Sequence, residues 1–153
     1  MLNAPPLFLV DSTLREGEQF AHAHFTTADK IDIAQALDAF GVDFIEVTSP
    51  RASDKAMTDC QTIAALGLRA KVLTHVRCDL RDAQLALDCG VAGVNMMFGT
   101  SAYLRQYSHG KDIQAIIERA REVIDFLRGA NVEILRQQIG ALTKRKVKLE
   151  IKE

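Results

Sequence analysis

The feature that most constrains the fold is a regular alternation of short apolar segments with longer helical patterns. Four segments rich in apolar and β-branched residues recur along the chain: LFLVD (7–11), FIEVTS (44–49), AKVLTHV (70–76) and GVNMMFG (93–99). Strands that alternate with helices pair in parallel, because each helix carries the chain back to the starting edge of the sheet. The alternation therefore predicts an α/β domain with a parallel sheet covered by helices.

Capping residues and glycines mark the ends of the helical patterns. Helices are expected at 27–41, 53–67, 79–90 and 111–129. In the first of them, Thr27 is the expected N-cap and Gly41 ends the helix. Its apolar face is expected to comprise Ile31, Ala34, Leu37 and Phe40.

Four such βα units make either half of a (β/α)8 barrel or a small open, doubly wound sheet, and the pattern does not choose between them. The expected organisation is a half barrel over residues 1–128 with a segment, 129–153, packed on the same domain. In that segment, NVEILRQQIGALTKR (131–145) is predicted to form a helix. KVKLEIKE (146–153) is predicted to form an exposed or edge strand, because its apolar and charged residues alternate.

Composition and charge argue against several classes of protein. The 153 residues carry a net charge of −1, which gives no electrostatic basis for binding nucleic acid or an anionic membrane. No apolar run is long enough to span a bilayer, and MLNAPPLFLV lacks the basic start and cleavage site of a signal peptide. Cys60, Cys78 and Cys89 form no CxxC pair, which favours reduced, partly buried thiols in a cytosolic protein.

The first apolar segment runs directly into a densely charged stretch, DSTLREGEQF (11–20). Asp11, Glu16 and Glu18 supply carboxylates, Arg15 a guanidinium and Gln19 an amide. The carboxyl ends of parallel strands form the binding face of such folds, so an active site is expected here. A carboxylate with nearby oxygen or imidazole ligands suits Mg²⁺ or Mn²⁺, and an arginine beside it can stabilise a developing oxyanion. The alternative is a polar loop whose first two residues cap the next turn.

The other predicted strands also end in polar residues. His75 lies within the third apolar segment and is expected to share one rim with Arg15 and Glu46. A histidine in a strand is either a hydrogen-bonded core residue or a functional group, and its position leaves both interpretations open. After the fourth segment, GTS (99–101) can present backbone N–H groups to an anion.

These motifs resemble those of a known enzyme family. DSTLREGEQF is similar to the signature of homocitrate synthases, in the wider group with isopropylmalate synthases and hydroxymethylglutaryl-CoA lyases. FIEVTSPRAS, KVLTHVRC and FGTSAYLRQYSHGKDI resemble further homocitrate synthase stretches in the same order. The resemblance covers about residues 7–128, and the pairing of REGEQF with LTHVRC points to homocitrate synthase rather than its relatives.

The resemblance implies a TIM barrel and an acyltransferase of lysine biosynthesis. In that family, acetyl-CoA and 2-oxoglutarate condense, and thioester hydrolysis yields homocitrate and CoA. A divalent metal, Mg²⁺ or Mn²⁺, chelates the keto acid. By motif match, Arg15 would be the catalytic group at the keto oxygen and Glu16 the metal carboxylate. The substrate-binding positions would be Gln19, Glu46, Thr48 and His75, of which His75 matches the position that selects the length of the keto acid.

The sequence departs from the family pattern in two places. Asn95 stands where family members often have aspartate. No His-x-His pair, which completes the metal site in the family, follows residue 25, and AHAH (21–24) lies in the wrong place to match. The expectation is a homocitrate synthase-like chain that is inactive alone, with weak or no metal binding.

The last segment, 129–153, resembles a helix and strand of a KH domain from a bacterial small-subunit ribosomal protein, without the GxxG loop that grips RNA. A truncated or chimeric chain would explain this change. Two other functions stay open: a recombined or engineered folding unit without catalysis, and weak RNA binding through the basic TKRKVK (143–148). Exposed sheet edges of a half barrel would also permit a homodimer.

Overall fold

A computed structural model describes residues 7–99, 110, 112–130, 132 and 134–140. The strands are β1 (Val10–Asp11), β2 (Phe44–Val47), β3 (Lys71–Arg77), β4 (Gly93–Gly99) and β5 (Ile134–Gly140). The helices are α1 (Thr27–Phe40), α2 (Asp54–Ala64), α3 (Leu80–Asp88) and α5 (Ile113–Gly129), with a short 3₁₀ helix, η1 (Gly17–Gln19). The predicted α/β class and the four predicted strands are therefore confirmed.

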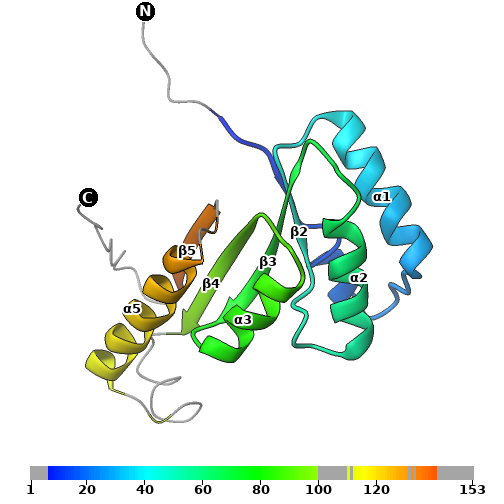
Figure 1. The fold of residues 1–153 in the computed structure, drawn as a ribbon. Helices are drawn as coiled ribbons and strands as arrows, with labels where there is room; N and C mark the ends of the chain where they lie inside the picture. The colour runs from blue at the N-terminus through cyan, green and yellow to red at the C-terminus, as the bar shows by residue number, and fades with distance from the viewer. Residues whose placement is uncertain (1–6, 100–109, 111, 131, 133, 141–153) are drawn as a thin grey trace, which may run out of the picture.

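The strand order chooses between the two predicted architectures. All neighbouring strands pair in parallel, and they lie in the order β1-β2-β3-β4-β5 (Figure 1). A doubly wound sheet reverses its strand order at a switch point, whereas a (β/α)8 barrel steps always to the next strand. Right-handed crossovers in one direction also place all the helices on one side of the sheet. The described part of the chain is therefore a segment of a barrel wall.

The N-cap of the first helix lies one residue earlier than predicted, and the buried face of the helix also differs from the prediction. Thr26, not Thr27, is the N-cap of α1, and it forms a capping box with Asp29. Gly41 ends the helix in a left-handed conformation with φ 95°, as a glycine there allows. Phe40 is 79% exposed, so its predicted place on the buried face is wrong. The residues of α1 that face inward are Lys30, Ile33, Ala34 and Leu37.

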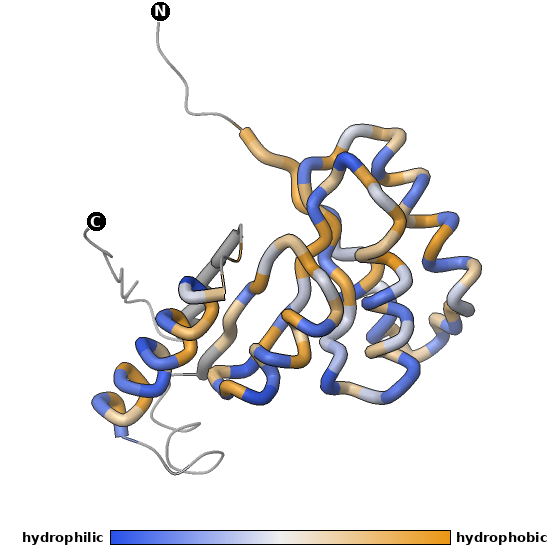
Figure 2. The backbone as a smooth tube through the Cα atoms, viewed as in Figure 1, coloured by the Kyte–Doolittle hydropathy of each residue, from blue (hydrophilic) through white to orange (hydrophobic). Residues whose placement is uncertain are grey.

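The hydrophobic core lies between the sheet and its helices. Alternate strand residues point to this side, among them Ile45 and Val47 from β2 and Val94 and Met96 from β4. Figure 2 shows the matching alternation of hydrophobic and hydrophilic residues along α5. The residues between those core positions, such as Glu46, project from the opposite face of the sheet, which is the inner face of a barrel wall.

The fifth strand corrects the prediction of a helix over residues 131–145. Residues 134–140 form β5, which pairs with β4 from Gly93–Ile134 to Gly99–Gly140. Val132, Leu135 and Ile139 have a spacing that also suits a helix, but the open edge of β4 offers unused backbone hydrogen bonds to an extended chain. The predicted edge strand KVKLEIKE (146–153) lies outside the described residues.

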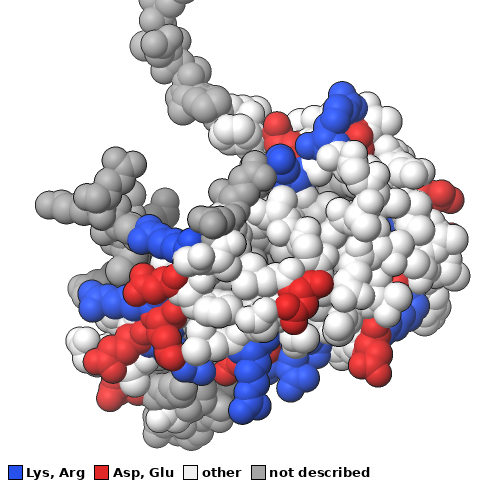
Figure 3. Space-filling model, viewed as in Figure 1, with Lys and Arg blue, Asp and Glu red and all other residues white. Residues whose placement is uncertain are grey.

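The surface of the described residues carries charges of both signs, and the cysteines are buried. Figure 3 shows acidic and basic side chains interspersed over one face of the described residues. No helix among the described residues is both long and apolar enough to cross a membrane. Cys60, Cys78 and Cys89 are all buried and free, as predicted, and burial raises the pKa of the Cys60 and Cys89 thiols.

Candidate active site

The loop after β1 is built from local hydrogen bonds and one buried side chain. The Asp11 carboxylate accepts hydrogen bonds from the Thr13 backbone N–H at 2.8 Å and from the Thr13 hydroxyl at 3.2 Å. The Ser12 carbonyl accepts from the Arg15 N–H at 3.0 Å. Leu14, 1% exposed, is inserted into the core between the helices and the sheet. The side chain of Asp11 therefore caps this turn, as the alternative interpretation of a polar loop held, while Arg15 faces the inner side of the sheet.

Four polar residues meet on that inner side, one from the loop after β1 and one each from β2, β3 and β4, and we call them the inner cluster: Arg15, Glu46, His75 and Asn95. The Asn95 side-chain Nδ2 donates to Glu46 Oε1 at 3.0 Å and lies 3.2 Å from His75 Nε2. Arg15 Nε lies 3.4 Å from Glu46 Oε2, so the guanidinium and the carboxylate form an ion pair. The register that sets His75 beside Asn95 across β3 and β4 brings these groups together.

His75 is held in its neutral form. It is 8% exposed, and burial lowers the pKa of its imidazole. The Arg15 charge lowers this pKa further, and the Glu46 carboxylate only partly opposes the two effects. Its Nδ1 lies 2.8 Å from the Met97 sulfur. Its Nε2 lies 3.2 Å from the Asn95 amide nitrogen and 3.4 Å from Glu46 Oε1.

The inner cluster keeps unused hydrogen-bonding capacity. Among the described residues, Arg15 Nε and Asn95 Oδ1 are buried without a hydrogen-bond partner. A buried donor and a buried acceptor in this state favour binding of a polar ligand, which would recover the cost of their desolvation. A cavity of about 300 Å³ opens beside the cluster. Its lining includes Ser49, Arg51, His75, Arg77 and Met97.

Of the other residues predicted for the site, Glu16 adjoins the inner cluster, whereas Gln19 and Thr48 lie apart from it. Glu16 is exposed and forms an ion pair with Arg15 at the mouth of the cluster. Gln19 is exposed at the end of η1. The Thr48 hydroxyl donates to Glu18 Oε2 at 2.6 Å and so turns away from Glu46. The structure therefore unites Arg15, Glu46 and His75, but not Gln19 or Thr48.

The described residues do not fit a complete metal centre. They contain no group of three or more His, Cys, Asp or Glu side chains that could hold an ion. Glu16 offers one carboxylate, and Arg15 already neutralises it. A hard divalent cation takes six or more oxygen ligands, so further ligands would be needed.

Sequence reasoning missed a second polar group, formed by Glu18, Lys30 and Asp59. Lys30 Nζ bonds to Asp59 Oδ2 at 2.6 Å and also to Glu18. Helical lysines and aspartates are usually solvated, so the charges of α1 and α2 gave no reason to expect burial. The available signal was the position of Lys30, which begins the i, i+3, i+4, i+7 series of Ile33, Ala34 and Leu37.

Comparisons with known proteins identify similar sequences. The chain is 58% identical over 126 residues to the cytosolic homocitrate synthase isozyme of Saccharomyces cerevisiae, which covers 82% of this chain and 29% of that protein. It is 56% identical over 132 residues to the mitochondrial homocitrate synthase of Yarrowia lipolytica, covering 86% and 30%. The chain thus spans less than a third of the length of these relatives.

A solved structure gives the same fold. The crystal structure of hydroxymethylglutaryl-CoA lyase from Pseudomonas aeruginosa matches with a TM-score of 0.69 and 27% identity, over 86% of this chain and 45% of that one. The HMGL-like family matches residues 7–149, including most of the segment that resembled a KH domain, and a KH-domain tail is therefore not supported. Because that match takes in most of the chain and all of the described residues, the chain belongs to the HMGL-like family.

Proposed function

We propose that this chain carries the keto-acid-binding part of a homocitrate synthase-type site, at which acetyl-CoA condenses with 2-oxoglutarate. The observation that carries the proposal is the meeting of Arg15, from the loop after β1, with Glu46 of β2 and His75 of β3 on the inner face of the sheet, where His75 also lines a cavity. The high identity to two fungal homocitrate synthases supports the choice of reaction. Localisation in the cytoplasm stays a prediction, since the similar proteins include cytosolic and mitochondrial isozymes.

Arg15 is the proposed catalytic residue. Its guanidinium is largely buried on the inner face, and its Nε lacks a hydrogen-bond partner among the described residues. A preorganised cation in such surroundings stabilises negative charge as it builds on the keto oxygen during attack by the acetyl-CoA enolate. Glu46 keeps the guanidinium oriented from the other side by their ion pair.

His75 and Gln19 are proposed to bind the keto acid. Neutral His75 can hydrogen-bond a carboxylate or keto oxygen through a ring N–H after a small rearrangement, and it borders the cavity. Exposed Gln19 is free to turn toward a bound ligand from η1. Thr48 is proposed to support the rim of the site by holding Glu18 through their hydrogen bond.

A divalent metal would act as a Lewis acid on the keto acid when bound. Glu16 is its proposed ligand in this chain, and no other described residue completes the site. We therefore propose that the chain, tested by itself, binds Mg²⁺ or Mn²⁺ weakly and gives no turnover. A folding unit without catalysis is the alternative, and it predicts no binding of 2-oxoglutarate.

The test measures two quantities on the purified chain and on its Arg15→Ala variant. Calorimetry with 2-oxoglutarate and Mg²⁺ should detect binding that Arg15→Ala weakens by about 10-fold or more, since the variant loses a charge-assisted contact. Release of CoA from acetyl-CoA should be absent in both. Arg121→Ala, which removes an exposed arginine of α5, is the matched control and should bind normally.

The outcomes separate the alternatives. If Arg15→Ala binds 2-oxoglutarate as well as the wild-type chain does, or if a folded wild-type chain does not bind it, the proposed site is overturned and the folding unit is favoured. CoA release that depends on Arg15 would overturn the proposed inactivity. A salt-sensitive gel shift with RNA would favour the remaining alternative, RNA binding through the last segment.

A homodimer through the sheet edge stays a proposal. β1 lies at one edge of the sheet, and Leu7, Phe8, Leu9 and Val10 are exposed apolar residues there. Exposed apolar edges favour association. Sedimentation velocity over a range of concentrations should show a dimer that Phe8→Lys removes.

A further inference from the structure

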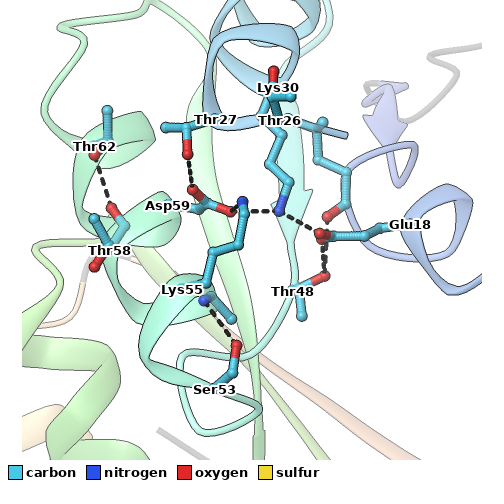
Figure 4. A network of polar contacts seen from close by, with 12 residues as sticks. Glu18, Thr26, Thr27, Lys30, Thr48, Ser53, Lys55, Thr58, Asp59 and Thr62 are labelled. Atoms are coloured by element: carbon cyan, nitrogen blue, oxygen red, sulfur yellow. Dashed lines mark hydrogen bonds and ion pairs between the residues drawn. The ribbon is translucent and has the colours of Figure 1, made fainter. Parts of the chain in front are cut away.

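The second polar group contains a lysine that is almost fully buried. Together with the three side chains that donate hydrogen bonds to its carboxylates, we call the group the Lys30 network: Glu18, Thr27, Lys30, Thr48, Lys55 and Asp59. Lys30 comes from α1 and is 2% exposed. Figure 4 shows its side chain extended between Asp59 of α2 on one side and Glu18 of the strand-one loop on the other.

The charges of the Lys30 network stabilise one another. Burial alone would lower the pKa of Lys30, but its hydrogen bonds to Asp59 and Glu18 outweigh burial and raise it. Burial likewise opposes the charge of Asp59, yet the hydrogen bonds from Lys30, Lys55 and Thr27 lower its pKa to about 2. Lys30 and Asp59 are therefore both charged near neutral pH, and Lys30 is the cation that joins the two carboxylates of the network.

The Lys30 network holds one end of the loop that carries Arg15. Leu14 is fixed in the core, and its carbonyl accepts hydrogen bonds from the backbone and the hydroxyl of Thr48, at 3.1 and 3.2 Å. Glu18 is fixed by Lys30 and by the Thr48 hydroxyl at 2.6 Å. Arg15 lies in the short span between these two anchors and points to the opposite side of the sheet. The position of Arg15 beside Glu46 is therefore determined by the two anchors, Leu14 and Glu18, on the side of the sheet that the helices cover.

From this arrangement we infer that Lys30 is a positioning residue, which holds Arg15 against Glu46 and His75 by fixing Glu18. Lys30 touches neither the inner cluster nor the cavity, so it acts only through the loop. The role in binding 2-oxoglutarate rests on the proposed function, whereas the role in placing Arg15 does not.

The test uses the imidazole of His75 as a sensor of the position of Arg15. The charged groups of the described residues that act on His75 are Arg15, Glu46 and Glu16, and Arg15 lowers its pKa. If Lys30→Met releases the loop, Arg15 moves away and the pKa of His75, followed by NMR titration of the whole chain, should rise by several tenths of a pH unit or more. A merely stabilising role would lower the unfolding midpoint and leave this pKa where it is.

Lys55→Met is the matched control. Lys55 also bonds to Asp59 Oδ2 at 2.6 Å, and the variant removes the same charge from the same carboxylate. Lys55 is 57% exposed and does not reach Glu18. Its variant should leave the pKa of His75 unchanged, and an equal rise in both variants would overturn the inference.

A second variant covers the case in which Lys30→Met does not fold. Thr48→Val removes the other hydrogen bond to Glu18 without leaving a buried charge uncompensated. It should raise the pKa of His75 in the same direction by a smaller amount. A folded Lys30→Met chain with an unchanged His75 pKa, or an unchanged pKa in Thr48→Val when Lys30→Met fails to fold, would overturn the inference.

Binding of 2-oxoglutarate links the inference to function. Lys30→Met should weaken binding by about 10- to 100-fold, as displacement of a contact by about 1 Å does, while Lys55→Met should not. A wild-type chain that does not bind 2-oxoglutarate would contradict the proposed function only. The His75 titration would still decide whether Lys30 positions Arg15.

Discussion

The inner cluster and the Lys30 network are both buried groups of charged residues, but they use their hydrogen-bonding capacity differently. In the Lys30 network, Asp59 meets two ammonium groups at 2.6 Å and a hydroxyl at 2.6 Å. In the inner cluster, the closest approach of Arg15 Nε to Glu46 is 3.4 Å. There, within the described residues, two buried polar atoms have no hydrogen-bond partner.

This difference separates a group that stabilises the fold from one that is suited to a ligand. A saturated network gains its full electrostatic energy on folding and has nothing left to offer a substrate. An unsaturated cluster costs stability, and that cost is recovered when a ligand supplies the missing partners. The two groups should therefore respond differently to substitution and to pH.

The largest difference is expected from removing a network cation. Lys30→Met leaves Glu18 and Asp59 with less compensation and should lower the free energy of unfolding by about 3 kcal/mol, as for other broken buried pairs. Lys55→Met should cost less than about 1 kcal/mol, because its lysine is exposed and Lys30 remains. Urea denaturation followed by circular dichroism measures both. Equal losses would show that burial of Lys30 adds nothing to the network.

Acid should weaken the Lys30 network next. The pKa of Asp59 is lowered from 3.8 to about 2 in the fold, so its contribution to stability is complete above about pH 5. That contribution is lost as the pH falls through about 2, and it amounts to about 2 kcal/mol. Asp59→Asn should be less stable at pH 5 and should show a flatter decline between pH 4 and pH 2. A decline of the same steepness would assign the acid sensitivity to other carboxylates.

A negative charge added to the inner cluster should instead be compensated by protonation of His75. Asn95→Asp places a carboxylate within hydrogen-bond distance of His75 and should raise the pKa of that imidazole by about 1 to 3 pH units. NMR titration of His75 measures the change. Asn95→Ala removes the same hydrogen bonds without adding charge and serves as the control. If the two variants titrate alike, the added charge is not felt by His75.

The smallest effect is expected from His75 itself. Its pKa is lowered in the fold by burial and by Arg15, so the folded protein favours the neutral ring. Stability should therefore be complete above pH 6.5 and should decline as the pH falls through the lowered pKa. His75→Gln should remove this slope, whereas His22→Gln, at an exposed position, should keep it. A slope that survives His75→Gln would point to another group.

Most of the fold was predictable because its pattern is periodic. The alternation of apolar segments and capped helices gave four strands, and the capping residues Ser53 and Asp79 are where the sequence indicated. The apolar spacing over β5 suits both a helix and a strand, which is why the pattern predicts a helix there. Only the neighbouring edge of β4 decides between the two structures. The choice of a barrel wall required the strand order, which is a tertiary property.

The inner cluster was easier to predict than the Lys30 network. Arg15 follows the first apolar segment, while Glu46 and His75 lie within the next two, and the geometry of parallel sheets then brings them close together. Lys30 and Asp59 lie on amphipathic helices, where charge normally indicates solvent. Their burial depends on two helices and a loop converging at once, and a single sequence carries little trace of that.

The strand order also bears on how the chain is made. Each strand pairs with the strand of the preceding unit, from β1 through to β5. During translation the N-terminal part of a protein leaves the ribosome first. Each newly emerging strand therefore finds its partner already outside the exit tunnel. No unit has to wait for a later one before it can pair with its predecessor, and few partly built states leave long unpaired segments. The open edge of the newest strand is then the template on which the next unit folds during translation.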